Sequence, residues 1–484
     1  MIGATRKAGG RGEGGRRGAG RLASSLALLA VLAAAPARAQ QSEPLSFQQA
    51  LDRMRAEHET LRAASQETGQ RREEREARKG LYWPKVELSG QFTRIDDPIV
   101  IDLDPIRKAI LALHPQVPAS RVPSFVEEVQ DETFWKADVR ATWPIYTGGK
   151  VAAANRAGDA RIADAEQQRR QAEQSLSSEL VRRYFAVRLA ASAQEVRSAV
   201  LAGLDRHLFE ARRLEEEGLI SKAERLHAEV ARSEADRQVK RAGHDLAIAR
   251  AALANILSQE AAGDPSSPLF VVAGLAPLEE FQAAASRDHP AFARLAAQQA
   301  LATQAVAAER ARWRPDVYLF AKRELHEGGL TLLDPKWAAG VGATFTLFDG
   351  FARGHDAAAV RLQLARVETL ESRARRDVAT LVEKRYREVE RSREQFDALA
   401  ATLDLARESL RVRTRAFEEG LATSLEVVDA RLALSRAQLE RLAAAYEFDV
   451  ALADLLEASG QADRFEALRQ QGKPVGAAAM EQQP

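Results

Sequence analysis

Four short segments of the chain alternate between apolar and polar residues with a period of two. They are VELSGQFTR at 86–94, WKADVRATWPI at 135–145, DVYLFAKRE at 316–324 and KWAAGVGATFTLF at 336–348, of which the third alternates least cleanly. Such alternation places apolar side chains on one face of a β-strand and polar side chains on the other. With Trp or Tyr near the ends, it is typical of a strand that spans a membrane in a β-barrel, although a soluble sheet with one wet face has the same pattern.

Most of the remaining chain has the character of long helices. Proline is absent from 145–264 and again from 336–473, in a background rich in Ala, Arg, Glu and Leu. Because proline interrupts helices and these other residues favour them, both stretches predict long helices. A single helix over 150–217 would be roughly 100 Å long at the ordinary rise per residue, which is more than a soluble globular core requires. Shorter helices are expected at about 46–79 and 278–312.

A glycine interrupts each long helical stretch, Gly218 within EEEGLISKAERLHAEV and Gly420 within FEEGLATSLEVVDARL. Glycine just past a helix end supplies the left-handed conformation that closes the helix. Ser221 and Thr423 follow the two glycines, and Glu224 stands three residues beyond Ser221, as a capping box requires. These features favour a helix–turn–helix hairpin in each stretch over one continuous helix with a tolerated glycine.

The second half of the chain repeats the first. Four residues of the first half recur at one constant spacing, giving the pairs Tyr146 and Phe348, Gly148 and Gly350, Tyr184 and Tyr386, and Glu224 and Glu426. The expected fold is therefore mainly α with a small β part, built from a duplicated β-β-α-α repeat with long coiled-coil hairpins. A proline-rich insertion at about 96–130 distinguishes the first copy, and we expect it to be an ordered or semi-ordered extracellular loop placed to restrict a barrel mouth.

The N-terminal residues have the composition of a secretory signal peptide. A basic stretch precedes the apolar run LASSLALLAVLAAA, and ARA fits the small-residue cleavage pattern. Without this basic segment the chain is acidic, which removes the main support for nucleic-acid binding. The predicted segments are a signal peptide at 1–39, a first structural repeat at 40–257, a linker at 258–276, a second repeat at 277–460 and a flexible C-terminal tail at 461–484.

The residues that usually carry catalysis form no recognisable set in this chain. The absence of cysteine excludes disulfides, thiolate metal sites and cysteine catalysis. The TGGK sequence at 147–150 lacks the spacing of a phosphate-binding loop, and no two histidines have the spacing of a zinc pair. We therefore expect no enzyme activity, no cofactor and no metal site. After residue 40 no apolar run is long enough for a transmembrane helix.

Four strands cannot close a barrel, and an open sheet edge in lipid leaves backbone groups without hydrogen-bond partners. If the strands cross a membrane, several copies of the chain must share one barrel. Two copies supply about eight strands, which side chains nearly fill, whereas three supply about twelve and leave an aqueous lumen. The helices continue directly from the strands, because only short glycine-containing joints separate them.

Over about residues 43–460 the chain resembles the TolC-type outer membrane efflux proteins. The resemblance rests on the signal peptide, the duplication, the joints PIYTGGK and TLFDGFARG, and the turns EEGLIS and EEGLATSLEVVDA. It implies a homotrimer with a twelve-stranded outer-membrane barrel in lipid and an α-helical periplasmic tunnel. It also implies a periplasmic adaptor and an inner-membrane pump, such as an RND or ABC transporter, as partners. The chain would then be the passive exit duct of a tripartite efflux or type I secretion system.

The same resemblance implies roles for residues at the two turns. Adaptor docking would involve Gly218, Leu219, Ser221, Gly420, Leu421 and Thr423. A periplasmic gate of acidic side chains would use Glu426 and Asp429, with Glu224 in the first copy. The chain departs from the family pattern at Ala422, where an arginine is common, so that inter-helix link is not expected. Ordinary solvated helix charge remains the alternative interpretation of the acidic positions.

A second class of function also fits the helical pattern. A wholly periplasmic coiled-coil scaffold or adaptor protein would place the four strands in a soluble sheet. Such an adaptor would ordinarily carry one central hairpin and a glycine-rich β domain, whereas this chain has two duplicated hairpins. Fractionation separates the two readings, because only the duct belongs in the outer membrane.

Overall fold

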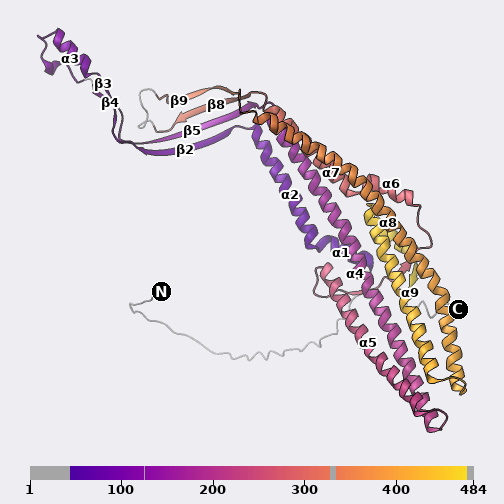
Figure 1. Ribbon diagram of the computed structural model, residues 1–484. Helices are drawn as coiled ribbons and strands as arrows, with labels where there is room; N and C mark the ends of the chain where they lie inside the picture. Colours follow the sequence, from indigo (N-terminus) through magenta and orange to yellow (C-terminus); the bar gives the residue numbers. More distant parts are fainter. Residues whose placement is uncertain (1–43, 125, 327–333, 477–484) are drawn as a thin grey trace, which may run out of the picture. The chain divides into compact units, whose positions relative to one another are not determined.

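A computed structural model describes residues 44–124, 126–326 and 334–476 (Figure 1). The chain divides into a unit of residues 1–42 and a unit of residues 43–484, and all that follows concerns the second unit. The predicted signal peptide at 1–39 lies outside the described residues, as does the end of the predicted tail.

Two long helical hairpins make up most of the described chain. The first consists of α4 (Lys150–Glu216) and α5 (Lys222–Ile256), and the second of α8 (Ala352–Glu418) and α9 (Ser424–Ala458). In each hairpin the two helices pack along one another, and α4 also packs on α9, which joins the hairpins (Figure 1). The hairpins predicted at the two glycines are therefore present. Among the described helices, none combines the length and the apolar character needed to cross a membrane.

The shorter helices differ from the prediction, which placed one helix where the structure has two. The four helices are α1 (Phe47–Glu57), α2 (Glu59–Lys79), α6 (Leu278–Asp288) and α7 (Pro290–Ala311). His58 and His289 separate them in an extended conformation, and each Nδ1 accepts a hydrogen bond of 3.2 Å from the backbone N–H two residues on. Pro290 explains the second break, because the residue before a proline avoids the helical conformation. No proline follows His58, and there the imidazole cap alone stabilises the start of the second helix.

The four predicted strands form one antiparallel sheet. They are β2 (Lys85–Arg94), β5 (Thr133–Tyr146), β8 (Asp316–Glu324) and β9 (Trp337–Thr344), in the order β2-β5-β8-β9. The last strand is shorter than predicted and ends at Thr344. The two repeats thus contribute two strands each, and β2 and β9 are left as the edges of the sheet.

The strand register gathers the apolar side chains on one face of the sheet. Val86 lies opposite Ala141, and Leu88 lies opposite Val139. Leu88 remains 73% exposed, so the described chain leaves this apolar face uncovered. On the other face Arg140 lies between Glu87 and Lys322. The alternation read from the sequence therefore corresponds to an apolar face and a charged face across β2 and β5, whereas in β8 Arg323 lies opposite Val139 on the apolar side.

The insertion of the first repeat forms a folded ribbon. It contains β3 (Ile99–Asp102), α3 (Asp104–Leu113), a short 3₁₀ helix η2 (Ala119–Arg121) and β4 (Val126–Gln130). The strands β3 and β4 pair antiparallel. Between this pair and the sheet, the Ile95 N–H donates to the Glu132 carbonyl at 2.8 Å, and Arg94 pairs with the Glu132 carboxylate at 2.5 Å. The ribbon therefore continues the β2–β5 pair.

An aromatic core lies where α1, α4 and the segment between the repeats meet. Phe47 packs edge-on against Tyr184 at 5.4 Å and also against Phe185 and Phe465. The Tyr184 hydroxyl is buried, and it donates to the Leu45 carbonyl at 2.7 Å and accepts from the Ser267 N–H at 2.9 Å. Both hydrogen bonds satisfy a polar group that would otherwise be costly to bury. The predicted linker contributes β6 (Asp264–Pro265), paired with β1 (Pro44–Leu45), and β7 (Leu269–Val271).

The prediction of a flexible tail at 461–484 is wrong for the described residues up to 476. They form η4 (Ala462–Arg464), α10 (Phe465–Gln471) and β10 (Lys473–Val475), which pairs antiparallel with β7. Phe465 and Val475 are buried in the aromatic core. Burial of these apolar side chains offsets the entropy lost on ordering the segment.

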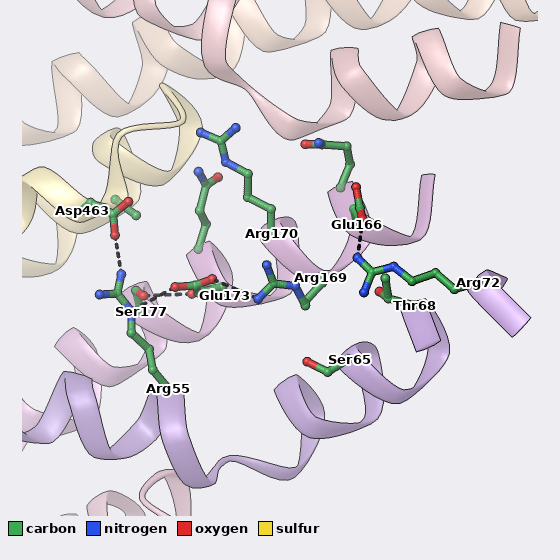
Figure 2. A pocket seen from close by; sticks show the side chains of 13 residues that line it. Arg55, Ser65, Thr68, Arg72, Glu166, Arg169, Arg170, Glu173, Ser177 and Asp463 are labelled. Atoms are coloured by element: carbon green, nitrogen blue, oxygen red, sulfur yellow. Dashed lines mark hydrogen bonds and ion pairs between the residues drawn. The ribbon is translucent and has the colours of Figure 1, made fainter. Parts of the chain in front are cut away.

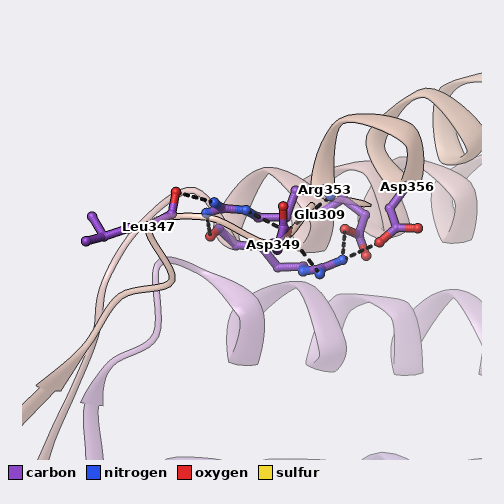
Figure 3. Close-up of polar contacts among 6 residues, drawn as sticks. Glu309, Leu347, Asp349, Arg353 and Asp356 are labelled. Carbon is purple, nitrogen blue, oxygen red and sulfur yellow. Dashed lines mark hydrogen bonds and ion pairs between the residues drawn. The ribbon is translucent and has the colours of Figure 1, made fainter. Parts of the chain in front are cut away.

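The joint between β9 and α8 is held by one buried arginine (Figure 3). Arg353 bonds through Nε to the Asp349 carboxylate at 2.9 Å, and it donates to the carbonyls of Leu347 at 3.2 Å and Arg312 at 3.4 Å. Its guanidinium also stacks 4.6 Å from the Trp313 ring. These contacts fasten the first turn of α8 to the end of α7, so the strand and the long helix are rigidly connected.

Candidate functional site

The two turns at the ends of the hairpins have the same local structure. Gly218 and Gly420 adopt positive φ angles of 76° and 75°. At the first turn the Gly218 N–H donates to the Glu215 carbonyl at 3.0 Å and the Leu219 N–H donates to the Leu214 carbonyl at 2.8 Å; the second turn has the same two bonds at the same distances. This pair of bonds is the Schellman motif, which requires a residue that tolerates the left-handed conformation.

A hydroxyl side chain starts the helix after each turn. Ser221 Oγ accepts from the Glu224 N–H at 3.3 Å, and Thr423 Oγ1 accepts from the Glu426 N–H at 3.4 Å. Only one of the two hydrogen bonds of the predicted capping box forms, namely the bond from the Glu224 N–H to the Ser221 hydroxyl. The Glu224 carboxylate does not return to Ser221; it instead accepts from the Ser424 N–H of the other hairpin at 3.4 Å.

Each turn presents an exposed leucine. Leu219 is 68% exposed and Leu421 is 79% exposed. In a Schellman motif the residue at this position ordinarily packs back against the helix, but these two side chains point away. The adjoining glycines are also open, because a Cβ at Gly218 or Gly420 would meet no atom within 4 Å. An apolar, sterically open surface at each turn is suited to contact with another protein, and the docking role of these residues stays a prediction.

The two hairpins are joined near their turns by a contact that sequence reasoning missed. The Ser424 hydroxyl lies 2.8 Å from His207 Nε2, and both residues are buried. The His207 ring packs 4.7 Å from the Phe417 ring. Because His207 belongs to α4 and Ser424 begins α9, this hydrogen bond and the Glu224 bond both tie the second hairpin to the first. A lone histidine in a helical stretch carried no signal of such a partner.

His207 is neutral in this setting. Burial, and to a smaller extent the positive charge of Arg431, lower its pKa to about 4, while a hydrogen bond with the Ser424 backbone opposes the change. Arg431, on α9, has its own pKa lowered by burial and by Arg206. The Arg431 guanidinium passes over Gly203 of α4, where an added Cβ would lie only 1.8 Å from Nη1. The glycine therefore makes room for a cation beside the His207–Ser424 contact.

The two predicted gate acids of the second copy have different surroundings. Glu426 forms an ion pair with Arg413 of α8 and accepts from the Thr423 hydroxyl at 3.3 Å. Asp429 is exposed, and within the described ranges no side chain bonds to it. Glu426 is therefore engaged within its own hairpin, whereas the Asp429 carboxylate is free to meet a ligand or a neighbouring copy.

The first hairpin closes its turn with the opposite arrangement of charge. Arg225 of α5 pairs with Glu215 of α4 at 2.6 Å and with Glu229 at 2.6 Å. In the second hairpin the arginine comes from the incoming helix and the acid from the outgoing one. His227, the counterpart of Asp429 in the first copy, is exposed. The two turns are thus alike in backbone and different in charge.

A polar cavity of about 540 Å³ lies beside α1, α2, α4 and η4 (Figure 2). Arg55 pairs with Glu173 at 3.0 Å and also with Asp463, and Arg72 pairs with Glu166 at 2.7 Å. These ion pairs neutralise most of the charged side chains that line the cavity. The electrostatic potential in the cavity is therefore neither strongly positive nor strongly negative. In the part of the chain that the structure describes, no group of His, Asp and Glu is arranged to hold a metal ion.

Comparison with protein families finds one match that covers both repeats. The family described as outer membrane efflux protein matches residues 50–259 and 282–461. The two matched segments correspond to the two structural repeats, and the gap between them contains β6 and β7. A comparison with curated proteins finds no match.

Solved structures with the same fold include three bacterial outer membrane proteins. The MtrE channel of Neisseria gonorrhoeae is 19% identical, with a TM-score of 0.68, over 86% of this chain and 89% of that one. The CmeC channel of Campylobacter jejuni is 14% identical, with a TM-score of 0.69, over 88% and 89%. VceC of Vibrio cholerae is 13% identical, with a TM-score of 0.67, over 86% and 96%. At these identities the likeness establishes the fold.

Proposed function

Because the chain belongs to the outer membrane efflux protein family, we propose that it is the exit duct of a tripartite efflux or type I secretion system. Its place is the outer membrane, with the helices extending into the periplasm. The duct conducts substrates passively. They pass from a periplasmic adaptor and an inner-membrane pump, such as an RND or ABC transporter, to the exterior.

The observation that carries this proposal is the uncovered apolar face of the sheet. Leu88, Phe92 and Val341 are each about two-thirds exposed or more, and charged residues of β2 and β5, such as Glu87 and Arg140, lie on the other face. A sheet in water buries its apolar side chains and exposes its polar ones, whereas a barrel wall places apolar side chains in lipid and polar ones in the lumen. A four-stranded sheet also leaves two edges unpaired, which lipid does not tolerate.

A homotrimer satisfies both requirements. Three sheets joined edge to edge, with β2 of one copy beside β9 of the next, would close a barrel of about twelve strands with an aqueous lumen. The rigid joint at Arg353 carries each sheet directly into the hairpins, so a closed barrel continues as a ring of helices. The hairpin turns then form the periplasmic mouth of the duct.

The turns are the proposed site of adaptor docking and gating. The docking surface comprises Gly218, Leu219, Ser221, Gly420, Leu421 and Thr423. Leu219 and Leu421 supply apolar contacts there. Asp429, Glu426 and Glu224 form the acidic gate, in which Asp429 supplies unpaired charge and Glu224 holds the two hairpins together.

A pair of arginine substitutions tests the membrane placement of the sheet. Leu88→Arg places a charge on the apolar face, whereas Ser89→Arg places it on the polar face beside Asp138. A charge in lipid costs about 2–4 kcal/mol near the midplane, so only Leu88→Arg is expected to reduce the heat-resistant oligomer in outer-membrane fractions. The wild-type oligomer is expected to form channels in planar bilayers.

The opposite result identifies the alternative. A periplasmic scaffold with a soluble sheet would tolerate Leu88→Arg as well as Ser89→Arg. It would also fractionate as a soluble protein without detergent and conduct no ions. Any one of these three findings would exclude the duct.

A further inference from the structure

The helix α3 of the inserted ribbon turns its apolar side outward. Ile106 is 54% exposed, Ile110 38% and Leu113 77%, and Leu103 just before the helix is also exposed. A helix packed on its own domain ordinarily does the reverse. Among the described residues nothing covers this row of side chains, so a single copy of the chain exposes an apolar surface to solvent.

The polar side of α3 is the side that packs on the rest of the ribbon. Arg107 donates through Nε to the Val122 carbonyl at 3.0 Å and through Nη2 to the Ala119 carbonyl at 3.3 Å. Asp104 accepts from the Ser124 hydroxyl at 3.3 Å. These bonds fix the rotation of the helix about its axis. The outward direction of the apolar row is thus built into the insertion.

The spacing of the apolar row favours a helical partner over a lipid surface. Leu103, Ile106, Ile110 and Leu113 follow one another at alternating steps of three and four residues. This is the narrow stripe of a coiled-coil seam, whereas helices that lie in a membrane surface have a broader apolar face.

The position of the ribbon favours another copy of the same chain as that partner. The ribbon continues the β2–β5 pair at the strand ends that lie away from α2 and α4 (Figure 1). Since β2 is an edge strand, the ribbon stands beside the place where the neighbouring copy joins the sheet. A stable complex of free partners needs about 800 Å² on each side, which a helix of 10 residues cannot supply. Copies already joined by the barrel meet at high effective concentration, so a small seam suffices.

We propose that the α3 helices of the copies in one oligomer pack together through Leu103, Ile106, Ile110 and Leu113 and form an apolar cap above the barrel. The proposal rests on the oligomeric duct proposed above. It makes the insertion a self-association element that narrows the outer mouth. Charged and bulky polar solutes would then pass only when the cap opens.

Single cysteines test this arrangement cleanly, because the natural chain has none. Ile106→Cys places a thiol in the seam, and Lys108→Cys places one on another face of the same helix. After mild oxidation of intact outer membranes, Ile106→Cys is expected to give disulfide-linked dimers at about tenfold the yield of Lys108→Cys or more. Ile110→Cys provides a second seam position if the first is poorly expressed.

Three outcomes overturn the proposal. Oligomers without cross-links at either seam position would show that the helices stand apart, and protection of those thiols by lipid would identify a membrane surface as the partner. Equal cross-linking at Lys108→Cys would show contact without a defined seam. The mass of each variant in detergent separates this result from failure of the duct itself, because a monomeric wild-type particle would refute both.

A functional measurement complements the cross-links. Ile106→Asp and Ile110→Asp together would place charge in the seam of every copy. We expect a severalfold increase in single-channel conductance at unchanged oligomer mass, whereas Lys108→Asp should leave conductance unchanged. Equal conductance of the seam variant and the wild type would contradict a cap.

Discussion

The Ser424 hydroxyl lies 2.8 Å from His207 Nε2 and thereby links the first turn of α9 to α4. The Ser424 N–H also donates to the Glu224 carboxylate, so one residue of the second hairpin contacts two of the first. Both His207 and Ser424 are buried. Any movement of the second hairpin away from the first must break these bonds and expose the imidazole to water.

Removal of this hydroxyl is expected to favour an open mouth. In Ser424→Ala the buried His207 loses its partner, which costs about 1–3 kcal/mol in the joined arrangement. We expect a higher open probability or conductance in planar bilayers. Ser221→Ala is the matched control, because Ser221 caps α5 within its own hairpin and bonds to no residue of the other. Equal conductance of the Ser424 variant and the wild type would rule out a role for this contact in closure.

Acidification is expected to act in the same direction through His207. Its pKa is about 4 in the joined hairpins and about 6.5 in water, so the separated state binds the proton more readily. The contact therefore stabilises the joined hairpins fully above about pH 6.5. This stabilisation weakens as the pH falls towards 4, by roughly 2 kcal/mol at pH 5. Nearby Arg431 stays charged throughout this range, because burial does not bring an arginine pKa down to acidic pH.

The measurement is channel conductance between pH 7.5 and pH 5. The wild type should open progressively over this interval. His207→Asn keeps a hydrogen-bonding side chain that does not titrate, and it should remove most of the change. A variant that responds to pH as the wild type does would assign the effect to another group.

The fold followed closely from local patterns in the sequence. Alternation placed β2 to within one residue of its observed bounds, and the paired glycines placed both turns, because each signal depends on a few adjacent residues. The break at His58 was missed, since an imidazole cap is a rarer helix start than Ser or Asp, and the break at His289 was missed although Pro290 signals it. The ordered segment after residue 460 was missed because Phe465 is stabilised by partners far away in the sequence.

The candidate site was predicted less completely than the fold. Gly218 and Gly420 could be recognised because a helix end has a local backbone requirement. The partners of acidic residues could not, since Glu224 and Glu426 occupy equivalent positions in the repeats and bond to different elements. Repetition in sequence therefore located the turns but not the contacts between hairpins.

The exposed leucines provide a direct test of adaptor docking. Leu421→Asp should preserve stability and oligomer mass, because the side chain is 79% exposed, and it should weaken binding of the adaptor in pull-down and efflux assays. Leu405→Asp on α8 is matched in exposure and lies away from the turn. An adaptor that binds the Leu421 variant normally would remove this leucine from the docking surface.

A buried carboxylate in α9 predicts a stability change that depends on pH. Asp449 is fully buried, and within the described chain neither oxygen meets hydrogen-bond geometry. Burial raises its pKa well above the usual range, against smaller effects of the Phe270 backbone and Arg469. The folded state thus holds the proton more tightly than the unfolded state, so stability is greatest below the ordinary pKa of an aspartate and falls as the pH rises from there to the raised pKa.

Asp449→Asn is therefore expected to raise thermal stability at alkaline pH and to change it little at acidic pH. The expected gain is about 1–3 kcal/mol at pH 9, measured by thermal unfolding of the detergent-solubilised protein. Asp454→Asn on the same helix should destabilise instead, because Asp454 is paired with Arg182 and Arg385. A pH dependence unchanged by Asp449→Asn would indicate that the carboxyl is solvated.

The difference between Glu426 and Asp429 predicts how the duct is blocked by multivalent cations. Such cations bind carboxylate oxygens directly. Of these two residues, only Asp429 has carboxylate oxygens to which no described side chain bonds. Asp429→Asn should weaken block by a trivalent cation about tenfold or more, which corresponds to about 1.4 kcal/mol. Glu426→Gln should have a smaller effect, since Arg413 already holds that carboxylate. Block would be recorded from the periplasmic side in planar bilayers, with His227→Asn as a control at the equivalent position of the first hairpin. Equal loss of block in the Glu426 and Asp429 variants would mean that long-range charge, rather than direct coordination, attracts the cation.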